Sequence, residues 1–254
     1  MAQSSLQEVL ATEPVFALTS DMDWASEDCI QLLLETFADY PFKPTFFLTH
    51  ASRVVAEAAR ENRIDLGIHP NFLPQSSHGD DPQGVVAHVM KIVPDACGSR
   101  AHSYASSTHI INALVKAGIG YDSGPVLFLQ QNLVPLRHGA GLIHLPVFWE
   151  DDCHWESGKP WRFDLMREQF QQPGLKIIDV HPFFQALNVP DAEFYQKHKS
   201  HIQTLTREQA LAMRYKMEGC ASFTQDLLRF LGEVPSRVYT LNQLCDWAQK
   251  DSKA

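Results

Sequence analysis

The feature that most constrains this chain is a predicted buried strand followed at once by two acidic residues. Residues 14–19 form an apolar run that ends in small polar side chains, a pattern typical of a strand covered on both faces. Asp21 and Asp23 come next, and a helix is expected to begin near Ser26. In β/α proteins catalytic groups gather where a strand ends and its helix begins. Both aspartates are therefore candidate site residues, although aspartate is also common in ordinary turns.

Length and composition fit a globular α/β protein and argue against nucleic acid or a membrane as partner. The chain has 254 residues, of which 44% are apolar and 20% charged, and its net charge is −9. It has no basic run, and no window approaches the roughly 18 consecutive apolar residues that a membrane helix needs. Residues 1–6 do not predict a secretory signal, and the 5 widely spaced cysteines fit reduced thiols. We expect a cytoplasmic protein with one domain over residues 1–254, and the oligomeric state stays open.

Strand and helix patterns alternate along most of the chain, which favours one domain with a mostly parallel sheet or barrel. Further strands are expected over residues 44–49, 64–70, 120–123, 142–149, 176–182 and 238–241. Helices are expected over residues 51–60, 81–90, 106–117, 223–231 and 242–248, with Thr206 capping another.

Chemically capable side chains stand at four predicted strand ends. They are Asp21 with Asp23, His69, Arg100 with His102, and His181. Each has a plain explanation, since a His-Pro pair is often a simple chain break and a lone arginine a surface charge. The carboxyl ends of strands in one β/α sheet converge in space, however, so these residues are expected to meet. A carboxylate with several imidazoles predicts a divalent metal site of the Zn, Fe or Co type.

The order of these segments resembles the polysaccharide deacetylase superfamily, also called the NodB-homology or carbohydrate esterase family 4. The matching segments are Asp21-Met22-Asp23, residues 66–71 around His69, Arg100-Ala101-His102, residues 149–152, and Val180-His181-Pro182. Residues 69–74 and 100–103 are most similar to the WbmS-like branch, which is cytoplasmic and associated with lipopolysaccharide and O-antigen loci. The resemblance spans roughly residues 14–248 and implies a distorted (β/α) barrel of about seven parallel strands.

The resemblance also implies a role for each matching residue. Asp21 would be the general base, oriented by Arg100, and His181 would be the acid. Asp23 and His69 would bind a divalent metal, with Zn expected and Co, Fe or Ni as alternatives.

One departure from the family pattern leaves the third metal ligand open. The usual second motif has another histidine four residues after the first, and that position is Leu73 here. His78 and His102 are the candidate replacements. We expect His78 to bind the metal, because its loop of Ser, Gly and Pro is long enough to fold back over the site. His102, two residues after Arg100, would then contact the substrate. His78 could equally be a plain loop residue.

The remaining candidates are expected to contact substrate. They are Trp24, Asn71, His102, Trp149 and Asp151. The two tryptophans could wall the site and offer apolar faces to a sugar ring, and core packing explains them equally well. Asp151 or Asp152 could instead hold the second ring nitrogen of His181.

The sequence thus predicts a metal-dependent hydrolase that removes an N-acetyl group from an amino sugar or glycan precursor, with a role in lipopolysaccharide or O-antigen biosynthesis. The substrate would be a small carbohydrate or a nucleotide- or lipid-linked sugar. Two alternatives stay open. The same fold could hydrolyse another amide or a cyclic imide, or the chain could be a degenerate, metal-free barrel that binds a glycan or a partner protein. The presence of both Asp21 and His181 argues against the second alternative, since a pure binder needs neither a base nor an acid.

Overall fold

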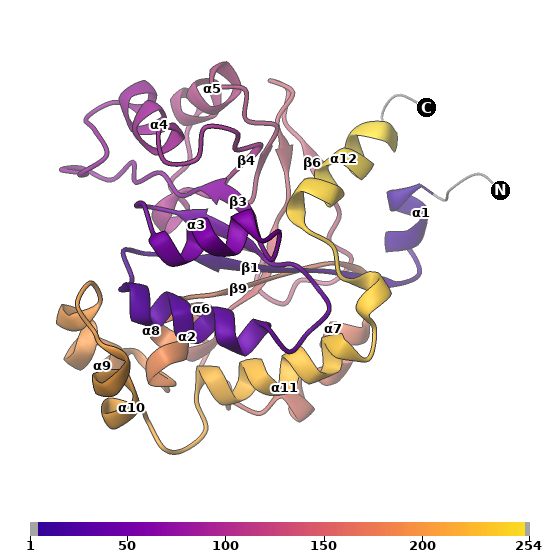
Figure 1. Cartoon of the computed structure of the whole chain (residues 1–254). Coiled ribbons are helices and arrows are strands. Elements are labelled where there is room, and N and C mark those ends of the chain that lie inside the picture. The colour runs from indigo at the N-terminus through magenta and orange to yellow at the C-terminus, as the bar shows by residue number, and fades with distance from the viewer. Residues whose placement is uncertain (1–4, 252–254) are drawn as a thin grey trace.

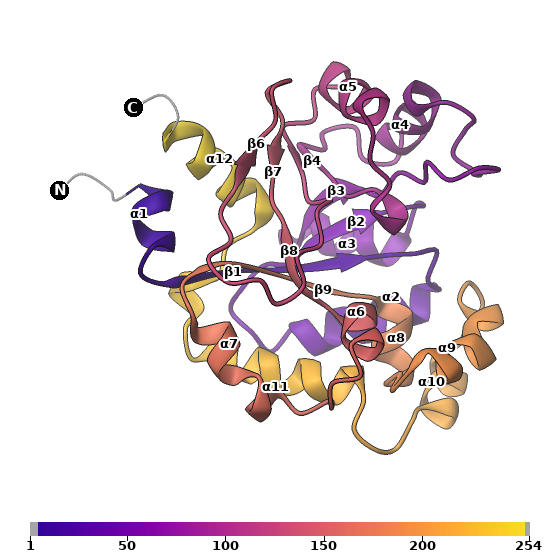
Figure 2. The same ribbon diagram turned by 180° about the vertical axis from the view of Figure 1, so that it is seen from behind.

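One curled, mostly parallel sheet forms the centre of the molecule, in a computed structural model that describes residues 5–251 (Figures 1 and 2). Within these residues the sheet has nine strands in the spatial order β6-β7-β5-β4-β3-β2-β1-β9-β8, and β6 alone runs antiparallel to its neighbour. The strands are β1 (Pro14–Asp21), β2 (Thr45–Leu48), β3 (Asp65–Ile68), β4 (Gly98–Ser99), β5 (Tyr121–Asp122), β6 (Leu136–Arg137), β7 (Ile143–His144), β8 (Val147–Glu150) and β9 (Gly174–Val180). This confirms the predicted α/β fold, with more strands than expected. Residues 1–4, where we expected no secretory signal, lie outside the described residues.

The sheet closes on itself through the segment that we predicted as a single strand over residues 142–149. That segment is divided into β7, which pairs with β5, and β8, which pairs with β9 at the other end of the strand order. Pro146 lies between them and has no N–H to donate to a ladder, which explains the break. Because only Leu145 and Pro146 separate β7 from β8, the two ends of the curled sheet meet here. With β7 and β8 taken as one kinked strand and β6 set aside, seven parallel strands remain, the predicted number.

Helices pack around this sheet (Figures 1 and 2). The α-helices are α1 (Leu6–Leu10), α2 (Glu27–Phe37), α3 (Arg53–Arg60), α4 (Pro82–Met90), α5 (Thr108–Lys116), α6 (Asp151–Glu156), α7 (Arg167–Gln171), α8 (Pro182–Leu187), α9 (Ala192–His198), α10 (Arg207–Met213), α11 (Cys220–Gly232) and α12 (Leu241–Asp251). Short 3₁₀ turns are η1 (His102–Tyr104), η2 (Phe163–Leu165), η3 (Lys199–His201) and η4 (Pro235–Arg237). In residues 5–251, none of the helices combines the length and the apolar character needed to span a membrane.

Several helices begin at the capping residues that the sequence indicates. The Ser26 side chain accepts a hydrogen bond from the backbone N–H of Cys29 at the start of α2. Asp81 caps α4, with Pro82 in the first turn. Thr206 caps α10. Such caps satisfy backbone donors that a helix start otherwise leaves unpaired.

The predicted strand over residues 238–241 is wrong. Val238 makes only an isolated bridge to Phe16, whose carbonyl accepts a hydrogen bond of 2.9 Å from the N–H of Tyr239. β1 pairs with β2 only from Thr19 onward, so the edge of β1 before Thr19 is open, and residues 238–239 cover it. The chain then enters α12 at Leu241, which leaves no room for a strand.

The core of the sheet is most deeply buried along β1 and β9. Every residue of these two strands is buried, and they pair in parallel over most of their length. Most of their side chains are apolar, but Thr19, Asp21 and Asp179 are polar and lie toward the carboxyl ends. Polar side chains in so buried a position need hydrogen-bonding or ionic partners. Residues at the ends of other strands of the sheet supply them.

Candidate active site

The carboxyl ends of four strands bring the predicted site residues together. Asp21 is the last residue of β1, and His69, Arg100 and His181 directly follow β3, β4 and β9. Because these strands are parallel, their ends lie on the same side of the sheet.

A strained turn after β1 positions Asp23. Asp23 and Trp24 have φ angles of 42° and 56°, in the left-handed region that a bulky side chain rarely adopts. The turn is held by the Thr49 hydroxyl, which accepts a hydrogen bond of 3.1 Å from the N–H of Trp24. Residues in such conformations gather at functional sites, where the surrounding structure enforces them. Here the turn directs the Asp23 carboxylate toward two histidines.

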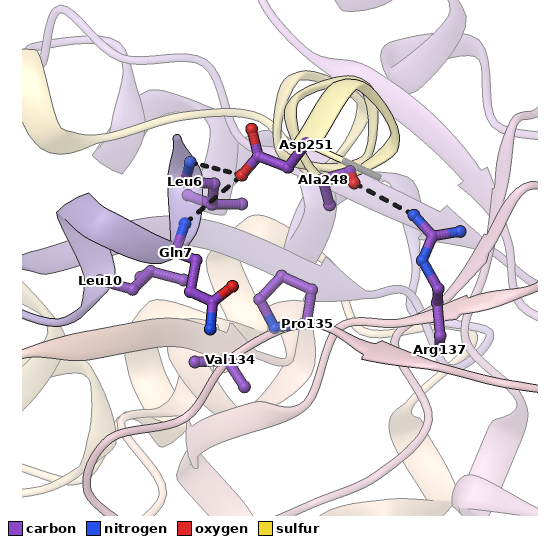
Figure 3. Close-up of a pocket in the computed structure, with 8 residues that line it drawn as sticks. All are labelled: Leu6, Gln7, Leu10, Val134, Pro135, Arg137, Ala248 and Asp251. Atoms are coloured by element: carbon purple, nitrogen blue, oxygen red, sulfur yellow. Dashed lines mark hydrogen bonds between the residues drawn. The ribbon is translucent and has the colours of Figure 1, made fainter. Parts of the chain in front are cut away.

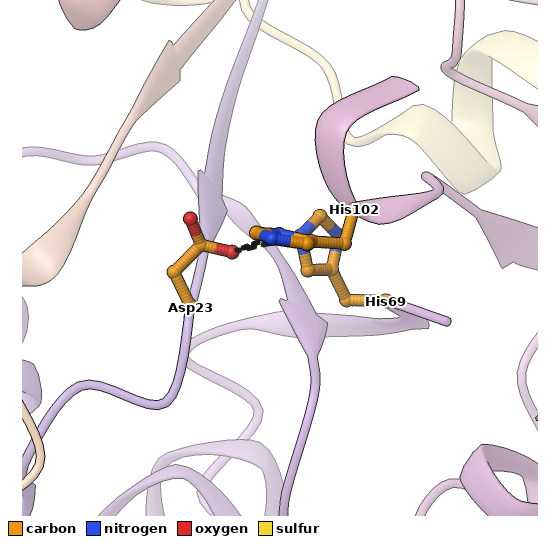
Figure 4. Close-up of side chains that lie close together, drawn as sticks. All are labelled: Asp23, His69 and His102. Atoms are coloured by element: carbon orange, nitrogen blue, oxygen red, sulfur yellow. Dashed lines mark hydrogen bonds and ion pairs between the residues drawn. The ribbon is translucent and has the colours of Figure 1, made fainter. Parts of the chain in front are cut away.

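Asp23, His69 and His102 form a candidate metal centre (Figure 4). Asp23 Oδ1 lies 3.0 Å from His69 Nε2 and 2.9 Å from His102 Nδ1. One ligand atom from each residue lies within 4.8 Å of the others. Burial acts to raise the pKa of Asp23, but hydrogen bonds from His102 and His69 hold it well below its usual value. An ionised carboxylate and two imidazoles form a donor set typical of catalytic zinc sites with an open position, so these residues fit a divalent cation.

His78, the expected third ligand, is not part of this group. It is buried, and its ring stacks on His88 with centroids 4.9 Å apart. Its Nδ1 accepts a hydrogen bond of 3.0 Å from the backbone N–H of Asn71, which fixes the neutral tautomer with the proton on Nε2. Burial and the neighbouring His88 also lower the pKa of His78 to about 4. With Nδ1 occupied and Nε2 protonated, His78 offers no free lone pair, and the geometry favours His102.

Arg100 anchors Asp21 from inside the barrel. The guanidinium is fully buried, and its Nη1 donates to Asp21 Oδ1 at 2.9 Å and to the carboxylate of Asp179. Nη1 also lies 2.9 Å from the Thr19 hydroxyl oxygen. On its other edge Nε donates to the Ser123 carbonyl at 3.1 Å and Nη2 to the Ser123 hydroxyl at 2.8 Å. A guanidinium bonded along both edges cannot rotate, so it fixes the orientation of Asp21.

The environment of Asp21 suits a proton acceptor. Burial raises its pKa to about 6, against the opposing charge of Arg100. Oδ1 is held by Arg100, whereas Oδ2 lies 3.7 Å from Nδ1 of His69, whose other ring nitrogen contacts Asp23. Asp21 thus has one oxygen anchored by Arg100 and one beside His69, a residue of the candidate metal centre.

His181 is oriented by Asp151. Its Nδ1 lies 2.7 Å from Asp151 Oδ1, and its backbone N–H donates to Asp151 Oδ2 at 3.0 Å. Gln185 Nε2 donates to the same Oδ2 at 3.1 Å. Burial alone would lower the pKa of His181, but the charge of Asp151 and the hydrogen bond to it raise that pKa well above the usual value. The other ring nitrogen, Nε2, lies 3.6 Å from Asp23 Oδ2 and so faces the metal centre.

Some of the residues that we expected to contact substrate lie at the site, and others lie in the interior of the protein. Trp24 lies at the site, with its ring centroid 5.1 Å from that of His102. The Asn71 side chain accepts a hydrogen bond of 3.0 Å from the N–H of Leu73 and so shapes the loop. Asp151 is fully buried against His181, which is the alternative role we considered for it and leaves it no exposed surface for substrate.

The prediction that Trp149 walls the site is wrong. Its side chain is fully buried and stacks on Phe223 with ring centroids 4.8 Å apart. Its Nε1 donates a hydrogen bond of 3.1 Å to His154 Nδ1. Successive strand residues point to opposite faces, so Glu150, and not Trp149, faces the site from β8. Trp149 is therefore part of the core.

Two buried carboxylates at the site were missed. Asp179 Oδ1 accepts from Arg100 and lies 2.7 Å from the Thr19 hydroxyl. Glu150 Oε1 lies 3.9 Å from His181 Nε2, and burial raises the pKa of Glu150 well above its usual value. The signal for Asp179 was available, because it is a charged residue in an apolar strand, two residues before His181 and hence on the same face.

The fold and this arrangement define a polysaccharide deacetylase-like protein, and comparison with known families agrees. Residues 18–199 match the family described as WbmS-like polysaccharide deacetylases, so the chain belongs to that family.

Solved structures similar to this chain include two candidate polysaccharide deacetylases. A candidate polysaccharide deacetylase involved in O-antigen biosynthesis, WbmS of Bordetella bronchiseptica, is 25% identical, with 85% of this chain and 90% of that chain covered and a TM-score of 0.76. A candidate polysaccharide deacetylase from Mycobacterium smegmatis is 15% identical, with 95% and 92% covered and a TM-score of 0.55, and so supports the fold alone. A search of curated proteins found no match.

Proposed function

We propose that this protein is a metal-dependent deacetylase that removes an N-acetyl group from an amino sugar of a glycan or glycan precursor. The observation that carries the proposal is the convergence of Asp23, His69 and His102 within 4.8 Å of one another. Around them lie an anchored carboxylate, Asp21, and an oriented imidazole, His181. Family membership supports the class of reaction.

The candidate metal centre would hold one divalent cation. We propose zinc, with cobalt, iron or nickel as alternatives, and His102 in place of His78 as the third ligand. When bound, the cation would lower the pKa of a water molecule and polarise the acetamide carbonyl.

Asp21 would act as the general base. Its Oδ2 would take a proton from the water that adds to the carbonyl carbon, while Arg100 holds Oδ1 in place. The buried setting that raises the pKa of Asp21 to about 6 makes it a better proton acceptor than an exposed aspartate, yet leaves it ionised near neutral pH.

His181 would act as the general acid. Asp151 binds Nδ1, which leaves Nε2 facing the centre to protonate the amine as the carbon–nitrogen bond breaks. The products are acetate and the free amino sugar, and the proton taken by Asp21 balances the proton given by His181. A protein that only bound a glycan would need neither Asp21 nor His181 to be held in this way.

A comparison of metal-free and metal-loaded protein tests this proposal. Each preparation is given an N-acetylglucosamine oligomer, and released acetate is measured. We expect acetate only from the metal-loaded protein. The proposal fails if no divalent metal supports acetate release, or if the metal-free protein is equally active.

We also propose a cytoplasmic location. The five cysteines, all within the described residues, are free thiols, as is usual in a reducing compartment.

A further inference from the structure

Glu150 is a buried acidic residue at the site to which the proposed mechanism assigns no role. It is the last residue of β8, and its side chain is only 2% exposed. It also stands at the N-cap position of α6, yet its side chain makes no capping hydrogen bond. A carboxyl group so deeply buried normally has a bonding partner, so the surroundings of its two oxygens indicate what it does.

The two oxygens of Glu150 have different surroundings. Oε2 accepts a hydrogen bond of 3.3 Å from the thiol of Cys153, which ties it to α6. Oε1 lies 3.9 Å from His181 Nε2, too far for a hydrogen bond, and within residues 5–251 it accepts none. One oxygen is therefore occupied, and the other faces the ring nitrogen that would protonate the leaving amine.

This geometry lets Glu150 and His181 bond the same atom of a substrate. Two atoms that are 3.9 Å apart can both contact a nitrogen placed about 2.9 Å from each of them. Asp151 holds Nδ1 of His181, so the ring keeps Nε2 turned toward this position. In the proposed reaction, Nε2 must approach the nitrogen of the scissile amide, and Glu150 Oε1 can then reach that nitrogen as well.

The charge of Glu150 suits this nitrogen before the amide bond breaks. Burial and the charge of Asp152 raise the pKa of Glu150 well above its usual value. Asp179 and Asp21 act in the same direction, and His181 opposes them. The high pKa favours the neutral acid, whose carbonyl oxygen can accept a hydrogen bond from the N–H of an uncharged acetamide.

Glu150 also suits the nitrogen after the bond has broken. His181 gives its proton to the leaving nitrogen, which becomes a free amine. The amine can then take the proton of the Glu150 carboxyl group, so that an O–H bond breaks, an N–H bond forms, and an ammonium ion lies beside a carboxylate. Amines are protonated near neutral pH, and a neighbouring positive charge favours the ionised form of a carboxyl group.

We propose that Glu150 is a further catalytic residue, which binds the leaving nitrogen beside His181 and then holds the product amine as its ammonium ion. This rests on the proposed function and deepens it, because it names the group that recognises the product. The site should then prefer a positively charged amino group to a neutral hydroxyl group at the same position of a ligand.

A cavity at the opposite end of the sheet, by contrast, has charged side chains that are already occupied (Figure 3). It has a volume of about 280 Å³ and lies between α1, β6 and α12, near the amino end of β1. Asp251 accepts a hydrogen bond of 2.6 Å from the N–H of Leu6, and Arg137 donates one of 3.2 Å to the Ala248 carbonyl. These side chains are bonded to the backbone of the protein itself.

Binding measurements on the full chain loaded with zinc test the role of Glu150. Isothermal titration calorimetry at pH 7 compares D-glucosamine with D-glucose, which carries a hydroxyl group where glucosamine carries its amino group. A hydrogen bond to a charged group is worth roughly 10- to 100-fold in affinity, so we expect glucosamine to bind at least about tenfold tighter than glucose. Glu150→Gln has nearly the same shape but cannot ionise, and it should bind the two sugars equally.

Two further variants separate a direct contact from other effects. Asp152→Asn is the matched control, because it removes a neighbouring negative charge from a side chain whose Oδ1 is bonded to the N–H of Cys153. It should keep the preference for glucosamine. Glu150→Asp retains an ionisable carboxyl group that is one methylene shorter, and it should show a reduced preference. Circular dichroism establishes that each variant is folded, and Glu150→Asp decides the question if Glu150→Gln does not fold.

The possible outcomes distinguish the amine contact from the reaction. The proposal is overturned if the unaltered protein binds glucosamine no tighter than glucose, if the variants at Glu150 keep the full preference, or if Asp152→Asn loses it to the same extent. Acetate release from an N-acetylglucosamine oligomer is measured in the same samples. The predicted preference without acetate release would contradict the deacetylase and leave the amine contact standing, whereas acetate release without the preference would do the reverse.

Discussion

Asp21 and Asp23 are two residues apart, yet they occupy different environments. Asp21 ends β1 inside the barrel, its side chain is 4% exposed, and it is paired with Arg100. Asp23 lies in the turn that follows, its side chain is 23% exposed, and it faces two imidazoles. Burial raises the pKa of Asp21 to about 6, whereas hydrogen bonds from His102 and His69 outweigh burial and hold the pKa of Asp23 well below its usual value. Environment, and not residue type, therefore suits one carboxylate to accept protons and the other to bind a cation.

Removal of the Asp23 carboxylate should have the largest effect. We expect Asp23→Ala to lose both bound metal and activity, because the two histidines alone would hold a divalent ion weakly. His69→Ala should behave in the same way. Elemental analysis and acetate release measure both properties. Retention of a full equivalent of metal by Asp23→Ala would contradict the role of ligand.

A substitution of Asp21 should separate the role of general base from the role of metal ligand. We expect Asp21→Asn to keep its metal and to lose about 10²- to 10⁴-fold in kcat, the usual contribution of a general base. The same two assays apply, with circular dichroism to show that the fold is kept. If Asp21→Asn lost the metal while Asp23→Asn kept it, the two assignments would be reversed.

Substitutions of two histidines test which residue is the third metal ligand. We expect His102→Ala to weaken metal binding by at least about 100-fold, because loss of outer-shell partners alone costs 10- to 100-fold. His78→Ala is the matched control and should change metal affinity little, since its Nδ1 bonds to the N–H of Asn71. Metal titrations of the two variants decide the question. The opposite ranking would restore His78, the residue expected from the sequence.

We expect the smallest effect from a substitution in β8, where two adjacent residues again lie in different environments. Trp149 is buried on Phe223, while Glu150 faces His181. Trp149→Phe should lower the free energy of unfolding by about 1–3 kcal/mol, through lost packing and the lost bond to His154, and should leave KM unchanged. Thermal unfolding and steady-state kinetics test this. A raised KM at unchanged stability would place Trp149 at the substrate.

Strand ends were the most predictable part of the site. Apolar runs that stop at Asp21, His69 and His181 indicate buried parallel strands, and parallel strands end at one side of a sheet. The structure has these residues there. The curled α/β fold was predictable for the same reason.

Features that depend on the path of a loop or on strand register were not predictable. Whether His78 or His102 meets Asp23 depends on the fold of the loop of residues 71–81, which a run of Ser, Gly and Pro does not specify. The face on which Trp149 lies depends on register, which shifts between Val147 and Trp149. The break at Pro146 depends on the closure of the sheet, a property of the whole barrel.

The position of the metal tests the central claim most directly. Anomalous scattering from crystals of the zinc-loaded protein would locate the ion without reference to activity. We predict one strong peak within coordination distance of Asp23, His69 Nε2 and His102 Nδ1, about 2.0–2.2 Å from each ligand atom. A peak bound by His78, a peak among Glu150, Asp152 and Cys153, or no peak at this centre would contradict the account.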